Sequence, residues 1–212
     1  MSTRSRPPPH PETRPRRGAP TETRARLVAA AAECFNVHGY YGVDAGEIAR
    51  HAGYATGTFY KHFKDKREIL LAAWDFWITG EWDVISAEAQ APGSPTEVAR
   101  RVLKSALKLH VRWYGLRASL LGLVPADEGV KDFYRNLQRR QLAIIAALRQ
   151  RLGRGRTARE SDAMLLLTVE RVFDAIAQGE LRDLKLRERE MLAQLTALLA
   201  DFIGSPDPGA AP

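Results

Sequence analysis

The sequence predicts an all-α protein, and three observations support this assignment. Apolar residues recur at helical spacing along most of the 212-residue chain, whereas the alternation typical of strands persists nowhere. Helix-capping residues such as Asp44 and Asp65 stand directly before the periodic segments. Glycine and proline divide these segments into helix-sized lengths, most clearly at residues 91–95. The chain is therefore expected to consist of helices packed on one another.

Residues 1–20 are basic and rich in proline, with five arginines and almost no apolar side chain. Such a segment cannot bury a core, so we expect residues 1–20 to be disordered. A basic arm of this kind either follows the phosphates of a nucleic acid or is a passive leader. The composition alone does not separate these two alternatives.

The first helix is predicted from about residue 23 to residue 37, ending at Gly39. Its apolar residues fall on one face at helical spacing, among them Leu27, Cys34 and Phe35. Cys34, the one cysteine of the chain, is interpreted as a small core residue on that face. A single cysteine excludes an internal disulfide framework and is typical of a reducing compartment, so we expect a cytoplasmic protein.

Two short helices around a tight turn are predicted between residues 43 and 63. Asp44 is a favourable N-cap, and Glu47 three residues later completes a capping box. Gly53 suits the sharp end of the first helix. The second helix has a polar side, while Phe59 and Phe63 form its apolar side. This is the layout of a helix-turn-helix, whose second helix enters the major groove of DNA.

The residues of this pair stand at spacings that resemble a known family. The pattern is Ile48-Ala49-x-x-Ala52-Gly53-x-x-x-Gly57-Thr58-x-Tyr60-x-x-Phe63, followed by Lys66 and Leu70, with Phe35-x-x-x-Gly39-Tyr40 upstream. It closely resembles the DNA-binding domain of the TetR family of bacterial transcriptional regulators over about residues 24–72. The chain departs from that pattern at Ala55, where a capping Ser or Thr is usual, at Tyr54 and at Ala45.

The resemblance implies a division of the chain and a set of DNA-binding residues. We expect a helix-turn-helix domain at 21–66, a helical regulatory and dimerisation domain at 67–204 and a flexible tail at 205–212. The residues implied to contact double-stranded DNA are Thr56, Gly57, Thr58, Tyr60, Lys61, His62 and Lys66. Gly57 either lets the helix approach the duplex closely or packs against a neighbouring helix, and Lys66 is implied to hold a phosphate.

The charge distribution also favours a nucleic-acid partner. Residues 1–64 contain ten Lys/Arg and five Asp/Glu, whereas the remaining 148 residues contain 22 and 20. The basic excess thus coincides with the predicted helix-turn-helix, where a polyanion would be bound. A solubilising basic tail accounts for part of the same excess.

The rest of the chain is predicted to form six further helices. The first begins with a capping box of Asp65 and Glu68 and extends to about Gln90. The others are expected at about residues 96–114, 116–123, 127–152, 158–178 and 187–203.

The last two of these helices carry broad apolar stripes that suit dimerisation. The resemblance implies that two helices from each subunit form a four-helix bundle and that a two-fold homodimer reads a palindromic operator. The expected interface residues are Leu167, Arg171, Asp174, Met191, Leu195, Leu198 and Phe202. Glu170 and Asp174 are expected to pair across the dimer. The alternative is that these stripes serve only the core of one subunit.

Aromatic residues are concentrated in the same helical half of the chain. The resemblance implies a small-molecule pocket there, and aromatic side chains with a few polar groups suit an apolar or aromatic ligand. The expected lining residues are Trp77, His110, Trp113, Tyr114, Phe133 and Phe173. Each of them has the alternative interpretation of an ordinary core residue.

The sequence as a whole indicates a transcriptional regulator, most simply a repressor that a small-molecule effector releases from DNA. The alternative is an architectural or partner-binding DNA protein of the same fold without an inducer. No clustered catalytic groups, metal-ligand spacing or phosphate-binding loop occur in the sequence. We therefore expect neither an enzyme nor a bound metal or cofactor. No apolar run is long enough for a membrane span, so no membrane partner is expected.

Overall fold

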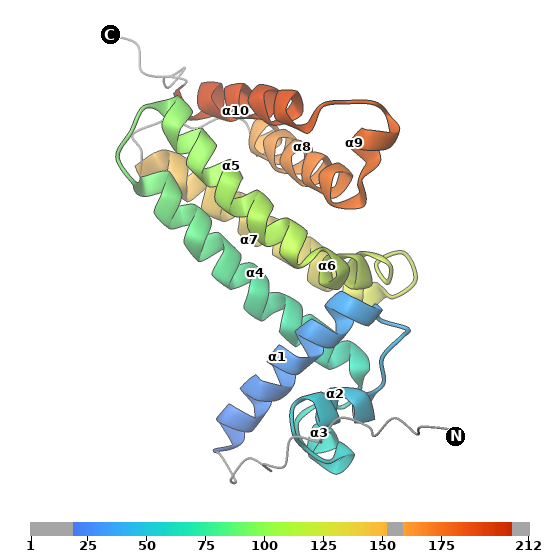
Figure 1. The fold of residues 1–212 in the computed structure, drawn as a ribbon. Helices are drawn as coiled ribbons and strands as arrows, with labels where there is room; N and C mark the ends of the chain where they lie inside the picture. The colour runs from blue at the N-terminus through green and yellow to red at the C-terminus, as the bar shows by residue number, and fades with distance from the viewer. Residues whose placement is uncertain (1–18, 152–158, 205–212) are drawn as a thin grey trace, which may run out of the picture.

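The computed structural model describes residues 19–151 and 159–204, which are almost entirely helical (Figure 1). No strand occurs within these two ranges, so the all-α prediction is confirmed. The expectations for the basic segment before residue 19 and for the tail at 205–212 lie outside the described residues. None of the helices in the described ranges has the length and apolar character needed to cross a membrane.

The helices follow one another with short connections. Their bounds are α1 Pro20–His38, α2 Ala45–His51, α3 Thr56–His62, α4 Lys66–Gln90, α5 Pro95–Arg112, α6 Tyr114–Leu121, α7 Glu128–Arg151, α8 Arg159–Gln178, α9 Glu180–Asp183 and α10 Glu188–Gly204. In Figure 1, α1, α2 and α3 form one end of the molecule and α8 to α10 lie at the other. The long helix α4 connects these regions and runs antiparallel to α5.

Capping side chains fix several of these boundaries. The Asp44 carboxylate accepts a hydrogen bond from the Glu47 N–H at 2.8 Å, and the Glu47 carboxylate accepts one from the Asp44 N–H at the same distance. Ser94 and Glu97 form an equivalent capping box at the start of α5. At the start of α4, the Asp65 carboxylate accepts a hydrogen bond from the Glu68 N–H. The Glu68 carboxylate, however, accepts its hydrogen bond from the Lys64 N–H and not from the Asp65 N–H. The predicted reciprocal box at that helix is therefore only half formed.

The core consists of two clusters of buried side chains. The first joins α1, α2, α3 and the start of α4, where Leu27, Phe35 and Phe59 have no exposed surface. It includes Cys34 and continues into Leu116 of α6. The second cluster joins α5, α8 and α10. The helix-turn-helix thus shares its core with helices that follow it far along the chain.

A close contact between α1 and α6 is part of the first cluster. The Asn36 side chain donates to the Arg112 carbonyl at 2.9 Å and accepts from the Leu116 N–H at 3.0 Å. A Cβ atom added at Gly115 would lie 1.9 Å from the Asn36 carbonyl oxygen. Only glycine allows the two backbones to approach this closely, so α6 is held directly against the C-terminal end of α1.

Candidate functional site

The turn between α2 and α3 is fixed by backbone geometry. Gly53 has a φ of 81°, a left-handed conformation that glycine adopts without a steric penalty. The Tyr54 N–H donates to the Ala49 carbonyl at 2.8 Å and closes the end of α2. Helix α3 begins after Ala55, and no side chain among the described residues caps it. The absence of a hydroxyl at Ala55 has therefore not prevented the second helix from forming.

The orientation of α3 is set by its two phenylalanines. Phe59 is fully buried and Phe63 is 1% exposed, whereas Tyr60 is 61% exposed. Thr56, Gly57 and Lys61 are exposed as well. Thr58 and His62 are half-buried at the edges of the same face. The structure thus brings six of the seven predicted DNA-binding residues onto one short helix with a largely open polar side.

Gly57 has free space around it. A Cβ atom at this position would meet no atom of the described chain within 4 Å. The alternative interpretation, that Gly57 packs against a neighbouring helix, is therefore wrong within the described part of the chain. A close approach of α3 to an external surface remains the interpretation that fits the space.

Lys66 contacts the loop after α1. Its ammonium donates to the Tyr40 carbonyl at 2.6 Å and to the Val43 carbonyl at 2.8 Å, and it lies 4.3 Å from the centre of the Tyr40 ring. An ammonium has three N–H donors, so these two bonds leave one for another acceptor. Lys66 therefore has a structural role that the sequence did not indicate, beside the implied phosphate contact.

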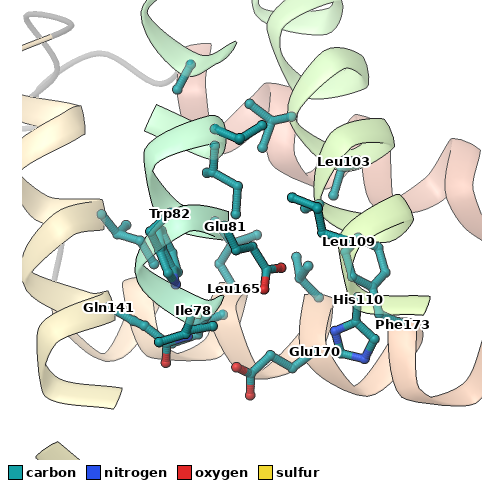
Figure 2. Close-up of a pocket in the computed structure, with 18 of the residues that line it drawn as sticks. Ile78, Glu81, Trp82, Leu103, Leu109, His110, Gln141, Leu165, Glu170 and Phe173 are labelled. Carbon is teal, nitrogen blue, oxygen red and sulfur yellow. The ribbon is translucent and has the colours of Figure 1, made fainter. Parts of the chain in front are cut away.

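A cavity of about 390 Å³ lies between α4, α5, α7, α8 and α10 (Figure 2). Four of the predicted lining residues border it, namely Trp77, His110, Trp113 and Phe173. Tyr114 and Phe133 do not, because Tyr114 lies at the start of α6 and Phe133 packs against the first core cluster. All four tryptophans of the chain line the cavity, adding Trp74 and Trp82 to the predicted pair. Apart from a few polar groups the walls are apolar.

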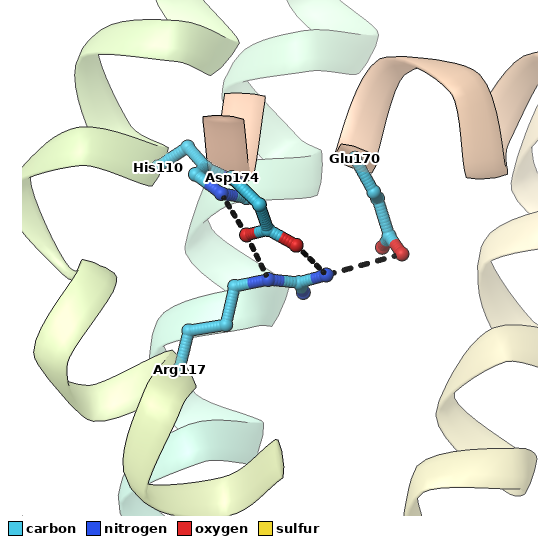
Figure 3. Close-up of polar contacts among 4 residues, drawn as sticks. All are labelled: His110, Arg117, Glu170 and Asp174. Atoms are coloured by element: carbon cyan, nitrogen blue, oxygen red, sulfur yellow. Dashed lines mark hydrogen bonds and ion pairs between the residues drawn. The ribbon is translucent and has the colours of Figure 1, made fainter. Parts of the chain in front are cut away.

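A buried ion cluster lies at one side of this cavity (Figure 3). Arg117 donates through Nε to Asp174 at 3.0 Å and through a terminal nitrogen to Glu170 at 3.2 Å. His110 is hydrogen-bonded to the same Asp174 oxygen at 2.8 Å. Glu170 and Asp174 therefore bind partners within their own subunit. The expectation that they pair across a dimer is wrong, because Arg117 and His110 already satisfy them.

The charges of this cluster stabilise one another. Burial opposes ionisation of Asp174, but hydrogen bonds from His110 and Arg117 outweigh it and lower the pKa of this carboxyl. Burial also disfavours the charged form of Arg117, yet Glu170 and Asp174 together raise the pKa of the guanidinium. The ionised cluster is thus a fixed element that connects α5, α6 and α8.

Glu81 of α4 is a polar lining residue that the sequence did not single out. Its carboxylate opens into the cavity, and no hydrogen bond or ion pair reaches it from the described residues. Burial raises the pKa of Glu81 to about 7, with Arg117 opposing and Glu170 supporting this shift. The sequence did not predict that Glu81 is buried. The residue pattern of α4 does not indicate which other helices cover this side of it.

The predicted dimer residues do not share one environment. Leu167 is 53% and Leu198 is 44% exposed, and Arg171 is exposed with its guanidinium bonded to Glu180 at 2.7 Å. Met191 is half-buried. Leu195 is buried in the second core cluster, and Phe202 lines the cavity. The apolar stripes of α8 and α10 therefore serve the subunit's own core and also leave exposed residues beside it.

No group of three His, Cys, Asp or Glu side chains in the described ranges is arranged to hold a metal ion. The structure thus presents two distinct features, an exposed helix-turn-helix and a largely apolar cavity, and α4 contributes to both.

Comparison with known proteins relates the first of these features to a sequence family. Residues 27–73 match the family described as bacterial regulatory proteins, tetR family. The HTH-type transcriptional regulator AcrR of Shigella flexneri is 34% identical over 84 residues, which cover 39% of each protein. The uncharacterized HTH-type transcriptional regulator YezE of Bacillus subtilis is 28% identical over 80 residues, or 38% of this chain and 41% of that protein. These matches span about two-fifths of the curated relatives' length.

Solved structures resemble the chain over most of its length. The fatty acid degradation regulator FadR of Bacillus halodurans has a TM-score of 0.62 at 17% identity, covering 84% of this chain and 94% of that chain. The transcriptional regulator FadR of Bacillus subtilis, solved in complex with stearoyl-CoA, has a TM-score of 0.65 at 17% identity, covering 85% and 97%. At these identities the likeness concerns the fold.

Proposed function

The chain belongs to the TetR family of bacterial regulatory proteins, and from this premise we propose that it is a homodimeric transcriptional regulator that binds double-stranded DNA. The observation that carries the proposal is the orientation of α3. Phe59 and Phe63 anchor the helix in the core, while Tyr60 and Lys61 face outward. An exposed polar helix held rigidly on a small domain is what major-groove reading requires. DNA binding is assigned to residues 21–66, and regulation and dimerisation to residues 67–204.

The DNA contacts divide into two kinds. Thr56, Thr58 and Lys61 are proposed to contact base edges or nearby phosphates, and Tyr60 and His62 are proposed to contact the DNA backbone. Phosphate contacts fix the register of the helix on the duplex, and base contacts supply the sequence preference. A two-fold dimer places its two α3 helices about 34 Å apart, one turn of the duplex, so the operator is palindromic.

The cavity is proposed to hold a small-molecule effector that releases the protein from its operator. Helix α4 begins at the helix-turn-helix with Lys66 and lines the cavity from Trp74 to Ala89. A ligand that changes the packing around α4 therefore changes the position of α3 in both subunits. Coupling of two sites through one shared element is the basis of allosteric control. The B. subtilis FadR, a structure of the same fold, was solved in complex with stearoyl-CoA, which supports the proposal that a regulator of this fold binds a small molecule. The proposed regulator is a repressor that acts in the cytoplasm, at the nucleoid.

Selection of bound DNA from a random pool tests the DNA-binding part of the proposal. The purified protein is expected to enrich a palindrome with two half-sites about one helical turn apart. A Tyr60→Ala, Lys61→Ala double variant is the matched control, because both side chains are exposed and their loss leaves the core intact. Failure of the wild-type chain to enrich any sequence, or equal enrichment by the control, would contradict the assignment.

The alternative is an architectural or partner-binding DNA protein without an inducer. One experiment distinguishes it from a ligand-controlled repressor. Apolar and aromatic compounds are added to the protein while it is bound to its selected palindrome. A repressor of the proposed kind gains thermal stability from its effector and loses DNA affinity in the same concentration range. An architectural protein retains its DNA whichever compound fills the cavity.

A further inference from the structure

The polar groups of the cavity carry more information about its ligand than its apolar walls do. Glu81 reaches into the cavity from α4 with a carboxylate that binds nothing among the described residues (Figure 2). Gln141 also lines the cavity, but its Oε1 atom has almost no accessible surface and cannot be reached by a ligand, and the same holds for the unpaired indole N–H groups of Trp74, Trp77 and Trp113. An ionised carboxylate is costly in a largely apolar cavity when it has no partner. The Glu81 carboxylate therefore calls for a donor that the described chain does not supply.

The charges around Glu81 also favour a positively charged group. The carboxylates of Glu170 and Asp174 lie beside the cavity, and Arg117 is the guanidinium that faces them. Its hydrogen bonds are directed at Glu170 and Asp174, so it does not form an ion pair with Glu81. Three carboxylates thus lie beside one guanidinium, and His110 is hydrogen-bonded to Asp174. An anionic ligand head at this end would add a further negative charge in a region of low dielectric.

The other basic residue of the lining is engaged elsewhere. The Arg149 guanidinium donates to the Phe202 carbonyl and lies 4.1 Å from the centre of the Phe202 ring. The end of the cavity near Phe202 is otherwise bordered by apolar side chains, including Val102, Leu199 and Ile203. The cavity thus has an acidic end and an apolar end.

We infer that the cavity takes an amphiphilic organic amine, with its ammonium beside Glu81 and its apolar body directed toward α10. An ammonium has donors only, so it suits a carboxylate that lacks a partner. The faces of Trp77 and Trp113, whose rings lie 4.0 Å apart, add favourable contact with a cation at the same end. The inference rests on the proposed function, since it names the chemical class of the effector of that regulator.

The protonation behaviour of Glu81 fits such a ligand. Burial raises the pKa of this carboxyl to about 7, and a bound ammonium favours the ionised form. Affinity for an amine should therefore fall as the pH decreases from 8 to 6, where Glu81 takes up a proton. Of the other groups at this end, Arg117 is paired with Glu170 and Asp174, and His110 is hydrogen-bonded to Asp174.

Three ligands with the same chain length distinguish the contribution of charge to binding affinity from that of apolar contact. The full chain is titrated at pH 8 with 1-decylamine, 1-decanol and decanoic acid, each below its micellar concentration. Binding is followed through the fluorescence of the four tryptophans, all of which line the cavity, and is verified by calorimetry. Decylamine is expected to bind about tenfold more tightly than decanol, as for a charged hydrogen bond, and decanoate more weakly than both.

Two variants test the role of Glu81. Glu81→Gln keeps the size of the side chain and should abolish the preference for decylamine while leaving decanol binding unchanged. Asp83→Asn is the control, because Asp83 is exposed on the same helix and does not line the cavity. An unchanged amine preference in Glu81→Gln would overturn the inference. Decanoate or stearoyl-CoA binding to the wild type at least as tightly as decylamine would also overturn it.

A DNA-release assay distinguishes this inference from the proposed function. Amine binding that depends on Glu81 but leaves the selected palindrome bound supports the amine subsite and contradicts its role in regulation. Release of DNA by an anionic or neutral compound, without any effect of decylamine, supports the regulator and overturns the amine subsite.

Discussion

Gly57 occupies the open side of α3, where an added Cβ atom would contact nothing in the described chain. Alanine is favoured over glycine within helices by about 0.5–1 kcal/mol. We therefore expect Gly57→Ala to leave the fold as stable as the wild type or slightly more so, and to lower DNA affinity by about tenfold because its methyl group separates α3 from the groove. Urea unfolding and fluorescence anisotropy with the selected palindrome measure the two effects.

Gly80→Ala is the matched control for this variant. Gly80 also lies in a helix with open space around its Cβ position, but it lies on α4, where it borders the cavity, so the two variants are compared without an effector. It should gain stability in the same way and retain full DNA affinity. Identical DNA affinities for the two variants would contradict the place of Gly57 at the DNA interface.

Glu81 destabilises the fold when it is ionised. Its pKa rises from an ordinary value of 4.5 to about 7 on folding, so the folded chain binds a proton more readily than the unfolded chain. Stability is therefore lost as the pH increases from about 4.5 to 7 and stays low above that range. Glu81→Gln should raise the free energy of unfolding by about 1–3 kcal/mol at pH 8, and the difference should shrink toward pH 5. Urea titrations at both values check this, and a difference that grows toward acid pH would exclude it.

Individual side chains were predictable from the sequence only where local pattern decides their environment. The outward direction of Tyr60 and Lys61 follows from the positions of Phe59 and Phe63 on a short helix. The partners of Asp174 do not follow, because Arg117 is 57 residues away in sequence and reaches it only in the folded chain. Tyr114 and Phe133 were assigned to the cavity by composition, which carries no information about direction.

Helix α6 is the element through which the helix-turn-helix contacts the rest of the molecule most closely. A methyl group at Gly115 would collide with the Asn36 backbone, which cannot move aside as a flexible side chain would. Gly115→Ala should therefore separate α6 from α1 and lower the free energy of unfolding by about 1–3 kcal/mol, as overpacking does. Chemical denaturation measures this loss. The same substitution at Gly80, where space is open, is the control, and equal stability of the two variants would contradict the tight contact.

Helix boundaries were largely predictable because capping is local chemistry. Asp44 and Asp65 each precede a helix in the structure as predicted. The Ser94 cap of α5 was not predicted, because residues 91–95 were interpreted only as a break between helices. Helix α9 was missed, because its four residues are too few to show a period. It depends on Gly179, whose φ of 75° reverses the chain after α8.

Assembly of two subunits is expected to use the exposed apolar residues of α8 and α10. Leu167 and Leu198 remain exposed after the subunit has formed its own core. Leu167→Glu places a charge in that surface and should convert the dimer to a monomer, which sedimentation equilibrium would detect. DNA affinity should fall by at least about tenfold, because one α3 then contacts one half-site.

Phe76→Glu is the control for this substitution. Phe76 is 60% exposed, similar to Leu167, but lies on α4. It should leave the oligomeric state unchanged. Dimers that persist in Leu167→Glu, or dissociate equally in Phe76→Glu, would exclude α8 as the subunit contact.

The burial of Cys34 has a practical consequence for observing the motion of the two α3 helices. Cys34 lies on the buried face of α1 and is 7% exposed, and it is the only cysteine in the sequence. A cysteine introduced at an outward position of α3 would therefore be the one thiol open to a spin label in each subunit. The distance between the two labels would then report directly whether a bound amine moves the two α3 helices of the dimer apart.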